Sequence, residues 1–563
     1  MKQLYTRWGK ALEQERVLQE YPRPLMERSD YDNLNGLWEY AFSEEKKKPE
    51  KYDGEILVPF SPESVLSGVK RQLKPQEYLW YRKILKAADD REGKRLLLHF
   101  GAVDQACKVY VEGKEVYRHV GGYLPFSIDI TKAVKTGENE LVVRVQDYSD
   151  TSYHARGKQK LKRGGMFYTA QSGIWQTVWM ETVPRDYIHE LIWTPLYDKK
   201  AIALQVVSKA SLAVQVHIEG EEIPVQGMSN EEFTIPLTQF HPWTPDSPYL
   251  YRVSVTMGKD RVKSYFAMRI FSVEPDQKGI PRICLNHKEC FQKGVLDQGY
   301  WPDGLYTPPS DAAMIYDILQ MKQMGFNMLR KHIKIEPQRW YYHCDRLGMI
   351  VWQDMVNGGS TYQHWYVTYL ATAFSRLGVR VKDCYTKVLG RREKAGRLEF
   401  ILEMEETVHL LYSHPSICTW VIFNEGWGQF QTKDMTALLK KLDATRLIDQ
   451  ASGWFDQGGG DVKSIHNYFF SLRIKAEEKR ALVLSEFGGY SMRVRGHSAS
   501  RNVYGYGVFH SKKRLGLAYH KMMEQVIGPK IPQGLCATVY TQLSDVEDEV
   551  NGMLTYDRAV RKI

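Results

Sequence analysis

The feature that most constrains this chain is a change of pattern near residue 278. From there onward, short apolar runs alternate with amphipathic helical stretches. Eight of the runs are predicted to be strands: 290–296, 326–332, 349–355, 417–425, 447–452, 464–469, 481–487 and 537–545. Helices are expected between several of them, for example at 311–325 and 432–444. Eight β/α repeats in about 285 residues predict a (β/α)8 barrel over 278–563.

The residues before the barrel show a different pattern. A chain of 563 residues is too long for one hydrophobic core, so several domains are expected. Residues 1–184 contain many short strand-like runs broken by glycine-containing turns, which favours a β jelly-roll sandwich. Residues 185–277 continue the alternation over a length typical of an immunoglobulin-like β-sandwich. The predicted order is therefore jelly roll, immunoglobulin-like sandwich and catalytic barrel.

Polar side chains follow the apolar core of the predicted barrel strands. The fourth strand ends in Asn424 and Glu425, and the seventh ends in Ser485 and Glu486. Other strands end in Asp297, Arg330, His332, Asp354, His466, Tyr468 and Asp545. In barrels of this class, the carboxyl ends of the strands carry the catalytic residues.

Two glutamates facing each other across a barrel mouth form the apparatus of glycoside hydrolysis. One attacks the anomeric carbon, and the other protonates the leaving oxygen and later deprotonates water. Either glutamate alone is better explained by a structural ion pair at a strand end. Their joint presence on strands four and seven, with Asn424 before Glu425, favours the catalytic interpretation.

Several motifs in this order resemble glycoside hydrolase family 2, which includes β-galactosidases, β-glucuronidases and β-mannosidases. In the first domain they are WYRK (80–83), LHFGAVD (98–104), GGYLPFSIDIT (121–131) and SGIWQTVWME (172–181). In the barrel they are GVLDQGYWPDG (294–304), FNMLRKH (326–332), DRLGMIVWQD (345–354), FNEGWGQF (423–430), SEFGG (485–489) and TQLSDVEDEVNGMLTYDR (541–558). FNEGWG and SEFGG are specific as a pair.

The resemblance implies a retaining exo-β-glycosidase that works by double displacement. It implies Glu425 as acid/base and Glu486 as nucleophile, with Arg330 holding Glu486 ionised. Asn424 is expected to bind the sugar 2-hydroxyl, and Tyr468 to donate a hydrogen bond to Glu486. The expected hydroxyl ligands are Asp297, His332, Asp354 and His466, with Trp301, Trp427 and Trp454 as stacking walls. Core packing remains the alternative for this second group.

Departures from the family narrow the choice of sugar. The position where many relatives have a histidine after the strand-two arginine is Ile333 here. The Asn-x-Lys signature that reads a glucuronate carboxylate is missing after SEFGG; this region offers Arg493, Arg495, His497, Arg501 and Asn502 instead. A β-galactoside is the first expectation, a β-glucuronide or β-galacturonide the alternative, and a β-mannoside the third. A non-catalytic carbohydrate-binding protein remains open.

The insertion over 357–400, between the third and fourth strands, is expected to shape the aglycone side. It carries Tyr362, His364, Trp365 and Tyr366.

Composition limits the remaining partners. The net charge of +10 is spread along the chain, which favours a basic surface over an anionic substrate or nucleic acid. Seven scattered cysteines, without a CxxC pair, predict reduced thiols rather than disulfides or zinc ligands. No apolar stretch predicts a transmembrane helix, and the first residues lack a secretory h-region. We therefore expect a cytoplasmic protein with a carbohydrate substrate, without cofactor, metal, nucleic-acid or membrane partner; a homo-oligomer is left open.

Overall fold

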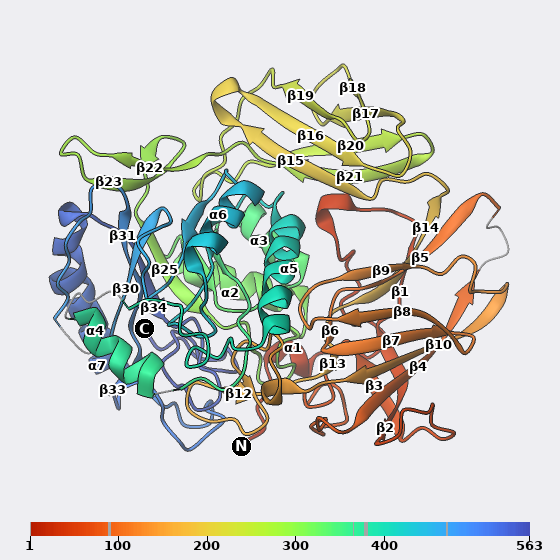
Figure 1. The fold of residues 1–563 in the computed structure, drawn as a ribbon, viewed down its shortest axis with the longest axis horizontal. Helices are drawn as coiled ribbons and strands as arrows, with labels where there is room; N and C mark the ends of the chain where they lie inside the picture. The colour runs from red at the N-terminus through yellow and green to blue at the C-terminus, as the bar shows by residue number, and fades with distance from the viewer. Residues whose placement is uncertain (1, 88–91, 364, 377–380, 469–470) are drawn as a thin grey trace.

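A computed structural model describes residues 2–87, 92–363, 365–376, 381–468 and 471–563. Two β-rich bodies and one β/α body follow each other along the chain (Figure 1). The first two are coloured red to orange and yellow, and the third runs from green to blue. This confirms the predicted fold class of two sandwiches followed by a barrel. The predicted residues His364 and Phe469 lie outside the described residues.

The first sandwich consists of two antiparallel sheets. The larger has the order β3 (Gly54–Val58), β2 (Gly36–Ser43), β4 (Tyr78–Ala87), β10 (Gly137–Gln146), β7 (Ala106–Val111), β8 (Lys114–Val120). The smaller has the order β1 (Tyr31–Asn33), β14 (Val178–Pro184), β5 (Lys94–Phe100), β9 (Phe126–Asp129). Alternate residues such as Val109, Val111, Val143 and Val145 point into one buried core, as period-two strands require.

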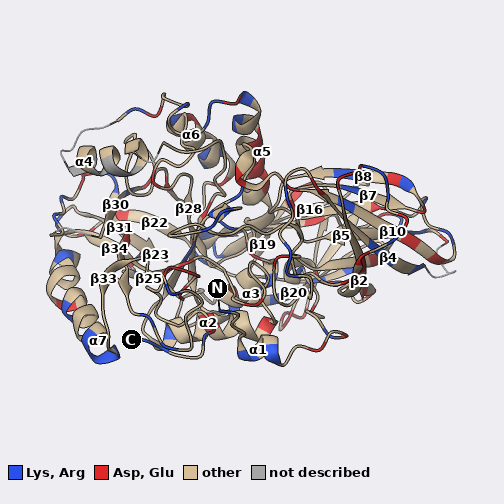
Figure 2. Cartoon of the chain, turned by 90° about the horizontal axis from the view of Figure 1, so that it is seen from below, with Lys and Arg blue, Asp and Glu red and all other residues tan. Residues whose placement is uncertain are grey.

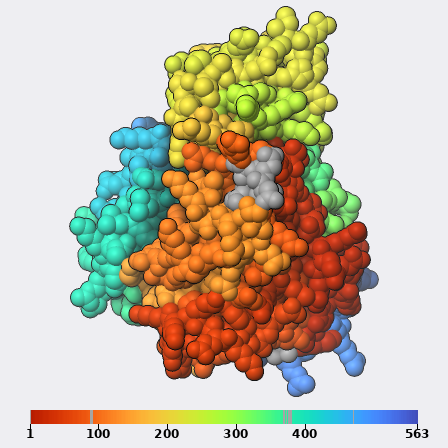
Figure 3. Space-filling view, turned by 90° about the vertical axis from the view of Figure 1, so that its right-hand side faces the viewer, coloured from red at the N-terminus to blue at the C-terminus, as the bar shows by residue number. Residues whose placement is uncertain are grey.

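The second sandwich is smaller and lies above the first in Figure 1. Its sheets have the orders β15 (Glu190–Leu196), β16 (Ala201–Val207), β19 (Glu232–Pro236), and β18 (Val225–Met228), β17 (Ala213–Ile218), β20 (Tyr251–Met257), β21 (Asp260–Phe266). Trp193 stacks on Phe266 in its core, with 5.1 Å between ring centroids. A buried ion pair from Arg28 Nη2 to Asp260 Oδ2, 2.8 Å long, joins this sandwich to the first. Figure 3 shows the two bodies in contact on one face.

Eight parallel strands form the barrel sheet. In order they are β29 (Leu447–Asp449), β28 (Ile417–Val421), β27 (Ile350–Asp354), β26 (Met328–Lys331), β25 (Gln292–Asp297), β34 (Leu535–Thr541), β31 (Ala481–Gly488) and β30 (Val462–Asn467). No ladder joins β29 to β30 among the described residues, so the barrel is nearly closed. The observed strands overlap all eight predicted runs.

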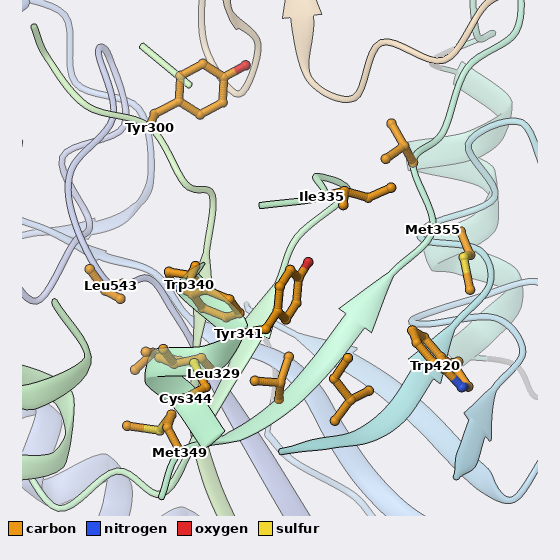
Figure 4. Close-up of a cluster of buried hydrophobic side chains, with 14 of the residues drawn as sticks. Tyr300, Leu329, Ile335, Trp340, Tyr341, Cys344, Met349, Met355, Trp420 and Leu543 are labelled. Atoms are coloured by element: carbon orange, nitrogen blue, oxygen red, sulfur yellow. The ribbon is translucent and has the colours of Figure 1, made fainter. Parts of the chain in front are cut away.

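Helices cover the outside of the barrel. They are α2 (Asp311–Gln323), α3 (Gln338–Leu347), α5 (Lys394–Leu411), α6 (Thr432–Leu442) and α7 (Lys512–Lys521). Figure 4 shows Trp340, Tyr341 and Cys344 of α3 packed in a buried cluster with Leu329 of β26. The i, i+1, i+4 spacing places these three side chains on one face. The predicted insertion over 357–400 ends inside α5, which begins at Lys394.

A small sheet that the sequence pattern did not reveal lies between the second sandwich and the barrel. It consists of β22 (Phe271–Pro275), β23 (Pro281–Leu285) and β24 (Lys288–Glu289). Phe271 and Ile283 share one buried cluster with Met328 and Val483 from the barrel strands. This packing fills the barrel interior, so the open carboxyl ends of the strands remain for chemistry.

Charged residues are distributed over the whole molecule. Lys and Arg alternate with Asp and Glu on all three bodies (Figure 2). Such mixing is typical of a solvated surface. No helix in the described part of the chain is both long and apolar enough to cross a lipid bilayer.

Candidate active site

Glu425 lies four residues beyond the end of β28, on a strained backbone. Its φ of +52° is in the left-handed region, which a glutamate rarely adopts. The Glu425 amide donates a 2.9 Å hydrogen bond to the Ser452 carbonyl, and Gly426 follows with φ +73°. A Cβ on Gly426 would lie 2.5 Å from the Phe455 ring. Strain of this kind is concentrated at functional sites.

Glu486 lies within β31 and is 5% exposed. The Tyr468 hydroxyl donates a 2.6 Å hydrogen bond to Oε2 of Glu486. Arg330 Nη1 lies 3.3 Å from Oε1 of the same carboxylate. Two predicted partners, from β26 and from the loop after β30, therefore converge on this glutamate.

His466 of β30 connects the two glutamates. Its Nδ1 lies 2.9 Å from Glu425 Oε1, and its Nε2 lies 3.6 Å from Glu486 Oε1. One ligand atom from each of the three side chains lies within 4.8 Å of the others. The side chains of Glu425 and Glu486 thus converge at one place.

Burial alone would raise the pKa of Glu486. The charges of His466 and Arg330 outweigh this effect and hold the pKa at about 2, below its usual value. An opposite charge nearby stabilises the ionised form of a carboxylate. Glu486 is therefore a carboxylate at neutral pH.

Arg330 organises a larger network at the barrel mouth. Its Nε and Nη2 donate to the two carboxylate oxygens of Asp354, at 2.9 and 3.0 Å. Nη2 also donates to Asn424 Oδ1 at 2.9 Å. His332 Nδ1 lies 2.8 Å from Asp354 Oδ2, so the Asp354 carboxylate is engaged by protein groups on both oxygens.

The structure does not bring Asp297 to this network. Its Oδ2 accepts from Lys331 Nζ at 2.7 Å and its Oδ1 from the Gly299 amide at 2.9 Å. Lys331 also pairs with Glu336 at 2.8 Å. Because neighbouring residues on a strand point to opposite faces, Lys331 and Asp297 lie on the face opposite Arg330.

The predicted tryptophans are divided between two regions. Trp454 donates from Nε1 to the Glu425 carbonyl at 3.1 Å, and its ring lies 5.5 Å from that of His466. Trp427 stacks on Phe167 of the first sandwich, with 5.5 Å between centroids. Trp301 instead packs beneath Arg558, whose Cζ lies 4.1 Å from the ring centroid.

Other predicted groups pair elsewhere or are exposed. Asp545 forms a buried ion pair with Lys562 at 2.6 Å. Arg493, Arg495 and Arg501 are exposed. Sequence reasoning missed Lys158, which lies near Trp427. The local basic run at 158–163 is the signal that could have found it.

The insertion after β27 covers the side of the site next to Glu425. Tyr366 stacks on Phe455 with 5.7 Å between ring centroids, while Trp365 is 58% exposed. This leaves an exposed aromatic ring at the rim.

In the described part of the chain, the histidine, cysteine and carboxylate groups close enough to share a metal ion are those of Glu425, His466 and Glu486. A metal ion would therefore have to bind to the two glutamates that converge at this site and to the histidine between them.

Comparison with known proteins identifies the family. Residues 68–184 match the model of the sugar-binding domain of glycosyl hydrolases family 2. Residues 197–269 match a model described as glycosyl hydrolases family 2, and residues 282–483 match the model of the family's TIM barrel domain. A Formosa agariphila protein with a provisional β-glucuronidase name is 26% identical over 73% of this chain and 50% of its own length. A β-galactosidase of Thermoanaerobacter pseudethanolicus is 28% identical over 49% of this chain and 39% of its own. The chain thus spans half or less of the length of these relatives.

Solved structures share the fold across nearly the whole chain. An uncultured Clostridium β-glucuronidase has a TM-score of 0.74 at 17% identity, covering 96% of this chain and 97% of that one. A β-galacturonidase from Eisenbergiella tayi, bound to galacturonate, has a TM-score of 0.71 at 18% identity, covering 97% of both. Three domain models of one family therefore match successive parts of this chain. The chain belongs to glycoside hydrolase family 2.

Proposed function

We propose that this protein is a retaining, exo-acting β-glycosidase with Glu486 as nucleophile and Glu425 as acid/base. The observation that carries the proposal is the approach of the two carboxylates to within 4.8 Å. Carboxyl groups are about 5–5.5 Å apart in retaining enzymes and about 6.5–9.5 Å apart in inverting ones, which leave room for a water. The separation supports retention.

In the first step, the ionised Glu486 attacks the anomeric carbon while protonated Glu425 gives its proton to the departing glycosidic oxygen. The bond to the aglycone breaks as an ester forms between the sugar and Glu486. The low pKa of Glu486, about 2, supports its role as the charged partner. Asn424, held by Arg330, is positioned to bind the sugar 2-hydroxyl.

In the second step, Glu425 takes a proton from water, which attacks the anomeric carbon and releases Glu486. Two inversions at one carbon give net retention. His466 lies beside both carboxylates and so can hold their positions relative to each other through both steps. Neither step uses a metal or an organic cofactor.

The substrate proposed first is a β-galactoside, with a β-glucuronide or β-galacturonide as the alternative and a β-mannoside third. Relatives named β-galactosidase and β-glucuronidase both support a hexoside or hexuronide. A binding-only protein would have no need of two converging carboxylates, one of them on a strained backbone. We also propose domain boundaries near residues 184 and 277.

A cytoplasmic location is part of the proposal. All seven cysteines are free, and all but Cys290 and Cys384 are buried. Free thiols of this kind are typical of a reducing compartment.

A panel of aryl β-glycosides tests the activity. Release of nitrophenol from a galactoside, glucuronide, galacturonide or mannoside, abolished in Glu486→Gln, is the expected result. Equal turnover in Glu486→Gln, or no turnover with any sugar, would reject the proposed function.

A further inference from the structure

A loop of the first sandwich reaches the mouth of the barrel. Ala155 forms a β-bridge with Gly358, and the amides of Arg156 and Gly157 donate to the Asn357 carbonyl at 3.0 and 3.1 Å. Residues 357 and 358 belong to the segment that follows β27. The loop is therefore held by main-chain hydrogen bonds against the barrel, next to the proposed active site.

Gly157 lets this loop approach closely. It has φ +59°, and a Cβ at this position would lie 2.9 Å from the Ile333 carbonyl oxygen. Any larger residue would push the loop away from the segment after β26. Ile333 directly follows His332, so the residue after Gly157 is placed beside the Arg330 network.

That residue is Lys158, which is 7% exposed. Its Nζ lies 5.9 Å from the ring centroid of Trp427 and 5.7 Å from that of Tyr168. Both rings come from elements around the site, since Trp427 follows Glu425 by two residues. The ammonium group thus lies between the first sandwich and the acid/base strand.

Lys158 differs from the other buried lysines of the described chain. Lys331, Lys334 and Lys562 each have a carboxylate oxygen between 2.6 and 2.8 Å away. Across the described residues, Lys158 Nζ has neither an ion pair within 4.0 Å nor a hydrogen bond. Two aromatic rings attract this ammonium group without neutralising its charge. An anionic ligand would supply the missing counter-charge.

The neighbours of Lys158 suit a sugar acid. For His332, burial lowers the pKa and the ammonium charge lowers it further. For Glu486, the ammonium charge acts against burial, after the larger effects of His466, Arg330 and His332. His332 Nε2 is buried without a hydrogen-bond partner in the described structure. Because Nδ1 faces the Asp354 carboxylate, a neutral His332 presents a lone pair at Nε2 that can accept from a hydroxyl.

The cation already in the site, Arg330, is engaged by Asp354, Asn424 and Glu486. The carboxylates of Glu425, Glu486 and Glu549 all lie around the site, and Glu549 is engaged by the Tyr168 hydroxyl. A negatively charged sugar can enter only if a cation balances its charge. Arg493, Arg495 and Arg501 are exposed, whereas Lys158 is buried beside the site.

We propose that Lys158, supplied by the first sandwich, binds the carboxylate of a uronic-acid substrate and selects it over the neutral hexose. The inference rests on the proposed function and chooses, among its substrates, the β-uronide. The barrel carries the proposed catalytic residues, whereas the residue that selects the substrate belongs to the first sandwich. A lysine binds a carboxylate as a point charge, through up to three donors.

The experiment compares sugars that differ only at C6. Wild-type protein, Lys158→Met and the control Lys162→Met are assayed with 4-nitrophenyl β-D-galacturonide against β-D-galactoside, and with β-D-glucuronide against β-D-glucoside. Lys162 is exposed in the same loop, so its substitution removes the same charge outside the site. We expect wild type and Lys162→Met to prefer the uronide of at least one pair. In Lys158→Met the uronide-to-hexoside ratio of kcat/KM should fall about 100-fold, as for the loss of a charged hydrogen bond.

A ratio that is unchanged in Lys158→Met, or a wild-type preference for the neutral sugar in both pairs, overturns the inference while leaving the proposed glycosidase activity intact. If no glycoside is hydrolysed, the proposed function fails, and calorimetry decides the inference separately. Binding of free galacturonate or glucuronate by wild type, absent for galactose and glucose and lost in Lys158→Met, would then uphold it. No uronate binding would reject it. The wild-type measurements decide the question even if Lys158→Met does not fold.

Discussion

Nδ1 of His466 lies 2.9 Å from Oε1 of Glu425. The other nitrogen of the same ring lies 3.6 Å from Glu486, so one imidazole spans the two proposed catalytic carboxylates. The charge of His466 lowers the pKa of Glu486. The acid limb of the pH profile should therefore depend on it.

Replacing His466 with glutamine should raise the pKa of Glu486. A positive charge on the imidazole favours the ionised form of the neighbouring carboxylate. Its charge is the largest of the effects that hold the Glu486 pKa near 2 against burial. Without it, the acid limb of kcat/KM should move to higher pH by about one unit. Profiles measured on the best aryl glycoside check this, with His497→Gln as control, because His497 pairs with Asp557 instead. A limb that stays in place or moves down contradicts the role given to His466.

Glu425→Gln should show a strong dependence on the leaving group. An acid that protonates the departing oxygen contributes about 10²–10⁴-fold for a poor leaving group. A dinitrophenolate departs without a proton, so bond cleavage for this aglycone should be much less impaired. Pre-steady-state bursts with dinitrophenyl glycosides, compared with turnover of alkyl glycosides, measure the difference. Equal losses for both aglycones would argue against Glu425 as the acid.

Gly426→Ala should damage the site more than an alanine at a matched glycine. Gly426 and Gly113 have the same φ of +73°, and nothing lies within 4 Å of a Cβ built on Gly113. Both substitutions carry backbone strain of about 1 kcal/mol. Gly426→Ala additionally meets the Phe455 ring at 2.5 Å and should displace Glu425. We expect loss of activity in Gly426→Ala alone, with thermal unfolding curves showing a larger drop in stability than for Gly113→Ala. Similar activities in the two variants would speak against this account of the strained strand end.

Treatment with a chelator should leave the hydrolytic rate unchanged. Both carboxylates are used as nucleophile and acid, so an ion between Glu425, His466 and Glu486 would block them. Added Zn²⁺, which favours imidazole and carboxylate ligands, should inhibit in competition with substrate. Initial rates after EDTA dialysis and with increasing Zn²⁺ measure both effects. Loss of activity in EDTA that Mg²⁺ or Zn²⁺ restores would contradict the metal-free chemistry.

The barrel and the carboxylate pair could be predicted because both depend on local pattern. Apolar strands alternating with helices specify the barrel, and its geometry brings all carboxyl ends of the strands to one rim. Glu425 and Glu486 follow the apolar parts of their strands, so their convergence was implied by position.

Side-chain direction at the rim was harder to predict. Asp297 and Arg330 both end apolar runs, yet Arg330 reaches Glu486 while Asp297 pairs with Lys331 on the opposite face. The end of a strand shows how far along the barrel axis a residue lies. Whether its side chain points into the barrel or out of it changes with a shift of one residue. The expected hydroxyl contact of Asp297 stays a prediction, with both its oxygens engaged by protein groups.

Contacts between domains had no local signal. Lys158 reaches the barrel because Gly157 packs against Ile333, about 175 residues away in the sequence. The small sheet of β22–β24 likewise became visible only from its packing against barrel strands. Its strands are too short to show a long alternation of apolar and polar residues, so this segment looks like a linker in the sequence.

The most direct test of the central claim is covalent trapping. A 2-deoxy-2-fluoro-β-glycoside of the preferred sugar with a dinitrophenyl leaving group should form a slowly hydrolysed ester, because fluorine destabilises the oxocarbenium-like transition state. Peptide mass spectrometry should then show one glycosyl group on Glu486 of the 481–488 strand. A label on any other residue, or hydrolysis of the natural glycoside with inversion and no ester, would contradict the proposed pairing of Glu425 and Glu486 on a single anomeric carbon.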